Sequence, residues 1–220
     1  EYFVPLALLP LIFLSRSLEW TGTLSALFMA YVIILMQNLN WLLILVVFYL
    51  LGITATKFKE KHKKLYNLHQ KVRSAKHVMA NAGVSMLMAI LGGTAGFYGF
   101  AGSLAAATAD TLSSELGVLS KSEPRMITTL ERAAKGTNGA VSFVGTLMGL
   151  GGAMIISLFA YLQMPELKII WVITAAGFIG CTVDSYFGAL IENKGWVGNS
   201  STNLIATTSG ALSAMILSVV

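Results

Sequence analysis

The stretch from Trp41 to Thr56 reads WLLILVVFYLLGITAT and contains no charged residue. Such a run is too apolar for the surface of a soluble protein, and it approaches the ~20 residues with which a helix crosses a bilayer. Seven further stretches of similar character lie on either side of it. The predicted membrane segments are Tyr2–Leu14, Trp20–Gln37, Trp41–Thr56, Val78–Leu91, Phe97–Leu116, Ala140–Leu162, Lys168–Leu190 and Asn203–Val220. The first and the fourth are the shortest, and both are candidates for broken or re-entrant segments.

The composition also indicates a membrane protein. Of the 220 residues, 55% are hydrophobic and 11% are charged, whereas charged residues make up ~25% of a soluble domain. No ten-residue alternating strands recur, so helices are the economical way to satisfy the backbone in hydrocarbon. We therefore expect an all-α polytopic membrane protein, a bundle of about seven or eight transmembrane helices forming one domain over residues 1–220. The single cysteine, Cys181, excludes an intrachain disulfide and a cysteine-rich zinc site.

The positive charge is concentrated in the loops. Residues 57–77 form the longest polar stretch and carry eight lysines and arginines against a single acid. The positive-inside rule makes this stretch a cytoplasmic loop, and alternation from it places every lysine and arginine except Lys168 inside. The loop is expected either to rest on anionic headgroups or to take a direct part in the chemistry. Its histidines, His62, His69 and His77, are expected to be solvated, because no acidic or thiol cluster accompanies them.

The only two aspartates, Asp110 and Asp184, both lie within predicted membrane segments. An ionisable group there costs several kcal/mol and by default marks a functional site. Both aspartates occupy a T-x-D-[ST] motif, at Thr108–Thr111 and Thr182–Ser185. We interpret the two motifs as an internal repeat of the kind that builds a site on a pseudo-two-fold axis, with chance similarity as the alternative.

Small residues share the helical faces of both aspartates. Residues three, four and seven apart lie on one face of a helix, and on these faces small side chains allow close packing or leave room for a ligand. We therefore expect both carboxylates to point inward. The residues concerned are Ser103, Ala106, Ala107, Ser113, Ser114 and Gly117 around Asp110, and Gly177, Gly180, Cys181, Phe187 and Gly188 around Asp184.

The unusual polar residues gather at the inner side of the membrane in this topology. Asn81, Asn138 and Asn203 begin their segments there, and both aspartates lie one to two turns from the inner end. Carboxylates, amides, helix N-termini and a basic rim are typical of a site for phosphate groups bridged by a divalent cation, Mg²⁺. The rim consists of Arg73, Lys76, Lys121, Arg125, Arg132 and Lys135. The outer halves of the segments are almost uniformly apolar, so a one-sided pocket for a lipid with a phosphorylated head fits better than a channel.

Three ordered stretches carry a family resemblance. They are Ala105–Gly117 (AAATADTLSSELG), Lys135–Ser142 (KGTNGAVS) and Val183–Ala189 (VDSYFGA). Together they resemble an integral-membrane family, formerly of unknown function, that includes the plant phytyl-phosphate kinase. The resemblance extends from about Arg73 to the C-terminus, with further matches at Met79–Gly83 and at Asn199 and Asn203. Leu112 departs from the family, which usually has Trp there.

The resemblance implies a membrane-embedded kinase. It would transfer a phosphoryl group from CTP or ATP, with Mg²⁺, to a phytyl- or geranylgeranyl-type isoprenoid monophosphate, giving the diphosphate. Within the motif-bearing part, residues 78–220, Asp110 and Asp184 would be the catalytic metal ligands. The residues assigned to phosphate and nucleotide binding are Arg73, Lys76, Asn81, Thr111, Glu115, Arg125, Arg132, Lys135, Thr137, Asn138, Ser185, Asn199 and Asn203.

Two of these assignments rest on local geometry. The turn Gly136–Gly139 is expected to open a helix, with its glycines allowing close backbone approach to phosphate. Glu115 lies ~140° around the helix from Asp110, so it is expected either to bind a basic residue or to be an interfacial charge.

The expected partners are the lipid monophosphate, the nucleotide and membrane lipids, with no nucleic acid. The protein would be integral and multi-pass, with its site facing the cytoplasm. One alternative is another lipid-phosphate transferase on the same metal site, such as a cytidylyltransferase that releases pyrophosphate. Another is a transporter or scramblase for prenyl phosphates. A purely structural membrane protein leaves the two aspartates without a purpose.

Overall fold

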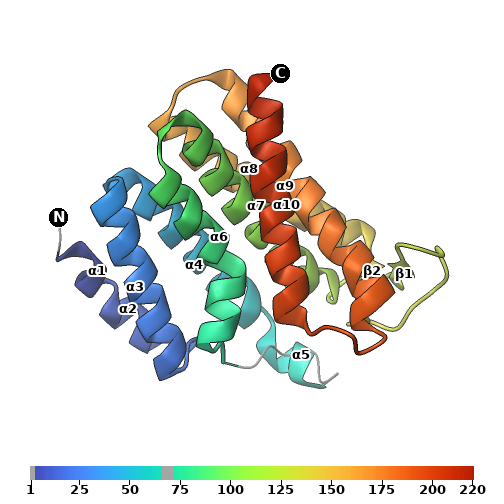
Figure 1. Cartoon of the computed structure of the whole chain (residues 1–220). Coiled ribbons are helices and arrows are strands. Elements are labelled where there is room, and N and C mark those ends of the chain that lie inside the picture. The colour runs from blue at the N-terminus through green and yellow to red at the C-terminus, as the bar shows by residue number, and fades with distance from the viewer. Residues whose placement is uncertain (1–2, 66–71) are drawn as a thin grey trace.

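The structure, a computed structural model, describes residues 3–65 and 72–220. It is a bundle of helices with one small two-stranded ladder (Figure 1). In chain order the elements are α1 (Val4–Ala7), α2 (Leu9–Ser15), α3 (Trp20–Met36), α4 (Leu39–Lys57), α5 (Glu60–Leu65), α6 (Ala75–Leu91), α7 (Gly93–Gly117), β1 (Arg125–Met126), β2 (Ala140–Val141), α8 (Phe143–Gln163), α9 (Leu167–Phe187), the π-helical turn η1 (Gly188–Glu192) and α10 (Asn199–Val219).

Helix α7 is the centre of the bundle. It packs against α4, α6, α8, α9 and α10, and every residue from Gly96 to Ala109 is buried. Small residues allow this close packing: a β-carbon at Gly102 would lie 2.6 Å from the carbonyl oxygen of Gly210 in α10. One at Gly180 in α9 would collide with the Ala106 methyl group. The small faces predicted around the aspartates are therefore helix–helix contacts.

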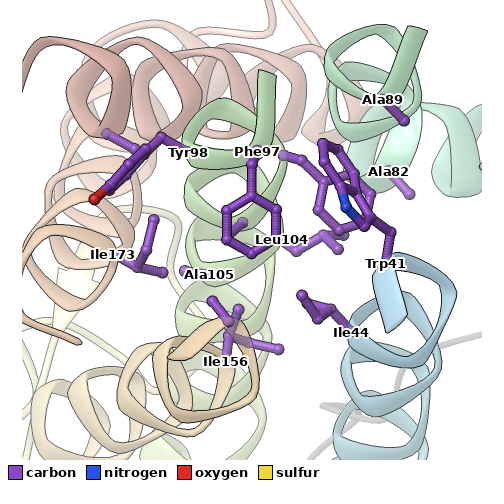
Figure 2. Close-up of a cluster of buried hydrophobic side chains, with 14 of the residues drawn as sticks. Trp41, Ile44, Ala82, Ala89, Phe97, Tyr98, Leu104, Ala105, Ile156 and Ile173 are labelled. Atoms are coloured by element: carbon purple, nitrogen blue, oxygen red, sulfur yellow. The ribbon is translucent and has the colours of Figure 1, made fainter. Parts of the chain in front are cut away.

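The apolar core lies toward the end of the bundle where α7 begins. Trp41 packs against Phe97 and Phe100, with ring centroids 5.1 Å and 4.8 Å apart. Ile156 from α8 and Ile173 from α9 complete the cluster (Figure 2). Asp110 and Asp184 come late in α7 and α9, so they lie toward the other end of the bundle.

The outside of the bundle is suited to lipid. Among the described residues, four helices are long and apolar enough to cross a membrane: α4, α8, α9 with η1, and α10. Shorter apolar helices are formed by residues 4–15, α3 and α6. Large apolar side chains such as Leu24, Leu158 and Leu212 are exposed on this surface. The predicted all-α membrane bundle is thus confirmed.

The structure gives the form of the two segments that were candidates for broken or re-entrant segments. The first is broken at Leu8 into α1 and α2, because Pro10 has no N–H to donate to a carbonyl one turn earlier. The fourth segment, in contrast, is the continuous helix α6. The prediction that a helix begins at Ala140 was wrong: Ala140–Val141 pairs antiparallel with Arg125–Met126, and the helix begins only after Ser142, whose hydroxyl accepts the Gly145 N–H at 3.1 Å.

The basic loop contains a structural anchor. Lys63 in α5 is only 1% exposed, and its ammonium lies 2.5 Å from a carboxylate oxygen of Glu115 in α7. It also donates to the carbonyl oxygens of Ala55 and Thr56 at the end of α4. His69 falls outside the described residues, as does the side chain of His62. The part of the loop that carries α5 is therefore tied to the central helix.

Candidate functional site

A polar cavity of about 340 Å³ opens among α7, α8, α9, α10 and the segment between α7 and α8. It contains both aspartates. Its other polar lining residues include Thr111, Ser113, Lys135, Thr137, Asn138, Ser142, Ser185, Glu192, Asn199 and Asn203. Parts of the chain that are more than 90 residues apart therefore converge at one end of the bundle.

The two aspartates lie near each other. Asp110 is supplied by α7 and Asp184 by α9, and their carboxyl groups are close enough to interact. Asp184 Oδ1 is buried and has no hydrogen-bond partner among the described residues, and the same holds for Oδ1 of Asn203 in α10. Buried acceptors are rarely left unpaired, and adjacent carboxylates repel unless a proton or a cation joins them. The pair and the amide oxygen thus form a polar centre that is suited to a ligand.

A third carboxylate, Glu192, lines the same cavity and was missed from the sequence. It lies beyond the end of the predicted segment Lys168–Leu190, but it ends the π-helical turn η1, in which the Asn193 N–H donates to the Gly188 carbonyl at 3.2 Å. In a regular α-helix Glu192 would lie ~80° around from Asp184, and the wider turn brings it back toward that face. Thr202 donates to Glu192 Oε2 at 3.1 Å and orients the carboxylate. No sequence pattern marks such a turn.

The donor set suits a hard cation. Within the described ranges, no three histidine, cysteine or acidic side chains converge closely enough to hold a metal by themselves. The unpartnered oxygens of Asp184 and Asn203, with Asp110 beside them, are the ligand type that Mg²⁺ takes, and Mg²⁺ commonly binds through one or two carboxylates while keeping several waters. Cys181 also lines the cavity, with its sulfur 3.6 Å from the Ser113 hydroxyl.

The turn Gly136–Gly139 is held against the end of α9. The carbonyl oxygen of Asn138 accepts from the Asn193 amide at 2.9 Å. Gly139 has φ +76°, and a β-carbon there would lie 2.6 Å from the Ser185 carbonyl oxygen, so glycine is required. This packing brings Thr137 and Asn138 to the cavity. The turn does not open a helix as predicted, because the strand β2 separates it from α8.

The structure brings nine of the predicted site residues to the cavity. They are Asp110, Thr111, Lys135, Thr137, Asn138, Asp184, Ser185, Asn199 and Asn203. Of the predicted basic rim, only Lys135 lines the cavity, and its ammonium donates to the Ser120 carbonyl oxygen at 2.5 Å.

Six predicted residues do not line the cavity. Glu115 points away from it toward Lys63, which agrees with the expectation of a basic partner but not with phosphate binding. Arg125 donates to the Leu130 carbonyl, and Arg132 pairs with Glu123 at 3.2 Å on the exposed surface. The other three are Arg73, Lys76 and Asn81, which line other hollows of the bundle.

Arg73 and His77 lie together at the base of α6. Arg73 donates to the Thr56 hydroxyl at 3.2 Å, and its backbone N–H and carbonyl pair with Ser17 and Glu19. Burial lowers the pKa of the Arg73 guanidinium, while the Glu115 carboxylate raises it. The prediction that His77 is solvated was wrong, because it is half-buried and lines the polar cavity.

Comparison with known proteins identifies relatives over most of the chain. The sequence is 39% identical over 206 residues to an uncharacterized membrane protein of Methanocaldococcus jannaschii, covering 92% of this chain and 87% of that protein. Protein PGR of Arabidopsis thaliana is 28% identical over 214 residues, with 82% and 74% covered. Protein VTE6 of the same plant, a chloroplastic protein, is 26% identical over 194 residues, with 80% and 57% covered. No solved structure matches the chain.

The family assignment rests on nearly the whole chain. Residues 3–211 match the family described as integral membrane protein DUF92. This range includes both aspartates, Asn138, Asn203 and the π-helical turn. The chain therefore belongs to the DUF92 family of integral membrane proteins.

Proposed function

We propose that this protein is a lipid-phosphate kinase that converts an isoprenoid monophosphate into its diphosphate at the polar cavity. The observation that carries the proposal is the neighbouring pair Asp110 and Asp184, with the unpartnered oxygens of Asp184 and Asn203 belonging to the same cavity. The sequence motifs support it, because they resemble the family that includes the plant phytyl-phosphate kinase. The lipid-facing surface supports it as well, since such a substrate would reach the site from the membrane.

The proposed reaction needs little covalent help from the protein. A phosphate oxygen of the lipid attacks the γ-phosphorus of CTP or ATP, and a new P–O bond forms. The bond from the γ-phosphorus to the bridging oxygen breaks, and the nucleoside diphosphate leaves with that electron pair. A phosphate monoester has a second pKa of ~6 and is already an anion near neutral pH, so no general base is required. Catalysis of this kind depends on positioning and on charge neutralisation.

The cavity residues divide between these two tasks. Asp110 and Asp184 would hold Mg²⁺, which on binding would supply charge neutralisation for the phosphate groups. The Asn138 and Asn203 side chains and the N-terminal turn of α8, which begins after Ser142, would orient phosphate oxygens. Lys135 would provide positive charge at the rim. Glu192 would add negative charge near the two aspartates.

The test uses the purified full chain in detergent or nanodiscs. It is incubated with Mg²⁺, with geranylgeranyl or phytyl monophosphate, and with CTP or ATP, and the products are analysed by mass spectrometry and ³¹P NMR. We expect the prenyl diphosphate together with the nucleoside diphosphate, and no product from the Asp184→Asn variant prepared in parallel. Release of pyrophosphate instead would overturn the kinase in favour of nucleotidyl transfer. Flux of prenyl phosphate into proteoliposomes without nucleotide, and without any product, would overturn it in favour of transport.

A further inference from the structure

A second cavity, of about 70 Å³, lies beside the polar one among α2, α3, α4 and α6. Its walls are almost entirely apolar, with Ile12 from α2, Ala26 and Ala30 from α3, and Val46 and Phe48 from α4. Helices α1 and α2 lie at the edge of the bundle next to α3 (Figure 1), so the broken N-terminal segment forms the outer wall. This cavity, which we call the apolar pocket, therefore lies between helices that face the membrane.

The polar groups of the apolar pocket are confined mainly to the side near the base of α6. Arg73, His77 and Asn81 come from the start of α6 and the residues before it, and Thr111 comes from α7. Arg73 is fixed there by its backbone pairing with Ser17 and Glu19. The pocket thus has a hydrocarbon wall and a polar end with a cation, which is the pattern expected for an amphipathic ligand whose head is anionic.

The apolar pocket adjoins the polar cavity. His77 and Thr111 line both of them. Thr111 directly follows Asp110, so the shared wall lies next to the paired carboxylates. A ligand with its head beside Asp110 therefore has apolar space for its tail on the far side of Thr111 and His77, between α3 and α4.

We propose that the apolar pocket holds the head-proximal isoprene units of the lipid monophosphate, whose phosphate reaches the polar cavity past Thr111 and His77. This inference rests on the proposed function and adds the site of the hydrocarbon chain. Residues of α3 and α4 then determine how well a given lipid is accepted. The side chains of Ala26 and Ala30 are the ones whose enlargement would fill the pocket.

The first test locates the chain directly in the wild-type protein. A geranylgeranyl monophosphate with a diazirine in an isoprene unit near the phosphate is bound to the full chain in nanodiscs, irradiated, and mapped by peptide mass spectrometry. We expect adducts on the α3 and α4 residues that line the apolar pocket. Adducts confined to the hollow between α6 and α10, around Met79 and Leu204, would overturn the proposal. The labelling is repeated with an excess of unlabelled geranylgeranyl monophosphate or of a phospholipid that has no phosphomonoester. If both reduce the adducts on α3 and α4 equally, the pocket holds a membrane acyl chain, and the proposal is overturned.

The second test compares two neighbouring substitutions on one helix. Ala26→Phe fills the apolar pocket, whereas Ser25→Phe adds the same side chain at a half-buried position that does not line it. Binding of geranylgeranyl monophosphate to each variant is measured directly. We expect Ala26→Phe to weaken binding by about tenfold, and Ser25→Phe to change it by less than about twofold. Equal effects of the two substitutions would contradict the pocket.

The two proposals fail in different ways. Adducts on α3 and α4 together with the selective effect of Ala26→Phe, but without any diphosphate product, would leave the lipid site in place and remove the kinase. Normal diphosphate formation by the Ala26→Phe variant, with adducts elsewhere, would leave the kinase in place and remove the pocket.

Discussion

The proximity of Asp110 and Asp184 brings two negative charges together in a buried place where each would repel the other. Such an arrangement weakens the fold unless something positive or a proton is shared between them. We therefore expect function at this site to depend on the charge of both side chains, and packing to depend on their shape.

Asn substitutions separate charge from shape. We expect Asp110→Asn and Asp184→Asn each to lower turnover of prenyl monophosphate by about 10³-fold, because the lost carboxylate would hold the Mg²⁺ that neutralises the reacting phosphates. Expression should stay near the wild-type level, and without Mg²⁺ the thermal midpoint should not fall, because one of the two repelling charges has been removed. Turnover is measured by mass spectrometry of the diphosphate at saturating Mg²⁺. Activity retained by either variant would remove that aspartate from the proposed metal site.

The sequence predicted the centre of this site better than its rim. An aspartate within an apolar segment has an unfavourable free energy in the membrane, whatever the exact ends of its helix. Asp110 and Asp184 could therefore be recognised without coordinates. The residues of the basic rim could not be predicted in this way, because a lysine or arginine in a loop can reach several different partners. Arg125 and Arg132 bind within their own loop, and Lys63 is drawn into the bundle by Glu115.

At the scale of elements, the π-helical turn η1 determines which acidic residues face the cavity. It adds the third carboxylate, Glu192, to the wall. Glu192 lies near Asp110 and Asp184, but among the described residues the three do not form a metal-binding group. We therefore expect its charge to act on a bound cation through space, without direct coordination.

We therefore expect Glu192→Gln to have a smaller effect than the aspartate variants. The amide oxygen can still accept from Thr202, so the turn should persist. Turnover should fall by about tenfold, together with a change in the Mg²⁺ concentration that gives half-maximal rate. Titration of the rate with Mg²⁺ checks this. Glu166→Gln, at the exposed start of α9, is the matched control, and an equal effect there would count against a role for Glu192.

The ion pair between Lys63 and Glu115 fastens α5 to the central helix. Removing one partner leaves a buried charge without compensation, so Glu115→Gln should destabilise the protein by about 3–5 kcal/mol. The exposed pair between Arg132 and Glu123 offers the contrast, and Glu123→Gln should change stability by less than about 1 kcal/mol. Denaturation in detergent measures both. Comparable losses of stability in the two variants would show that the buried pair contributes no more to stability than the exposed pair.

Element boundaries were predicted where apolar patterning alone determines them. Helices α3, α4, α6, α7 and α9 lie close to their predicted ranges, because burial and lipid contact favour the same residues. The start of α8 was not predicted correctly, because it is determined by the two-residue ladder and by the Ser142 cap. The break at Leu8 depends on proline, which a hydropathy pattern does not register.

For the whole molecule, the alternation of helices places α5 and the loop that carries β1 and β2 at the same end of the bundle (Figure 1). The positive-inside rule predicts that this end faces the cytoplasm. The opposite end contains the connection between α8 and α9.

Cysteine labelling tests this orientation. In a Cys181→Ala background, a single cysteine is placed at the exposed residue Ser122 or at the exposed residue Glu166. In intact bacteria we expect a membrane-impermeant maleimide to label Glu166→Cys, and to label Ser122→Cys only after lysis. The reverse pattern would invert the topology and would place the polar cavity at the outer surface.

The central position of α7 has a consequence for biosynthesis. This helix is 25 residues long, yet it is not among the four described helices whose composition suits an independent membrane span, and it carries Asp110. An aspartate in a nascent segment has an unfavourable free energy of transfer from the translocon into lipid, which reaches ~2.5–3.5 kcal/mol at the centre of the segment. Helices α8, α9 and α10, which surround α7, are synthesised after it. The ribosome must therefore supply the last third of the chain before α7, which carries Asp110, gains its neighbours α8, α9 and α10 in addition to α4 and α6. We expect chains truncated before α8 to be recognised by membrane quality control.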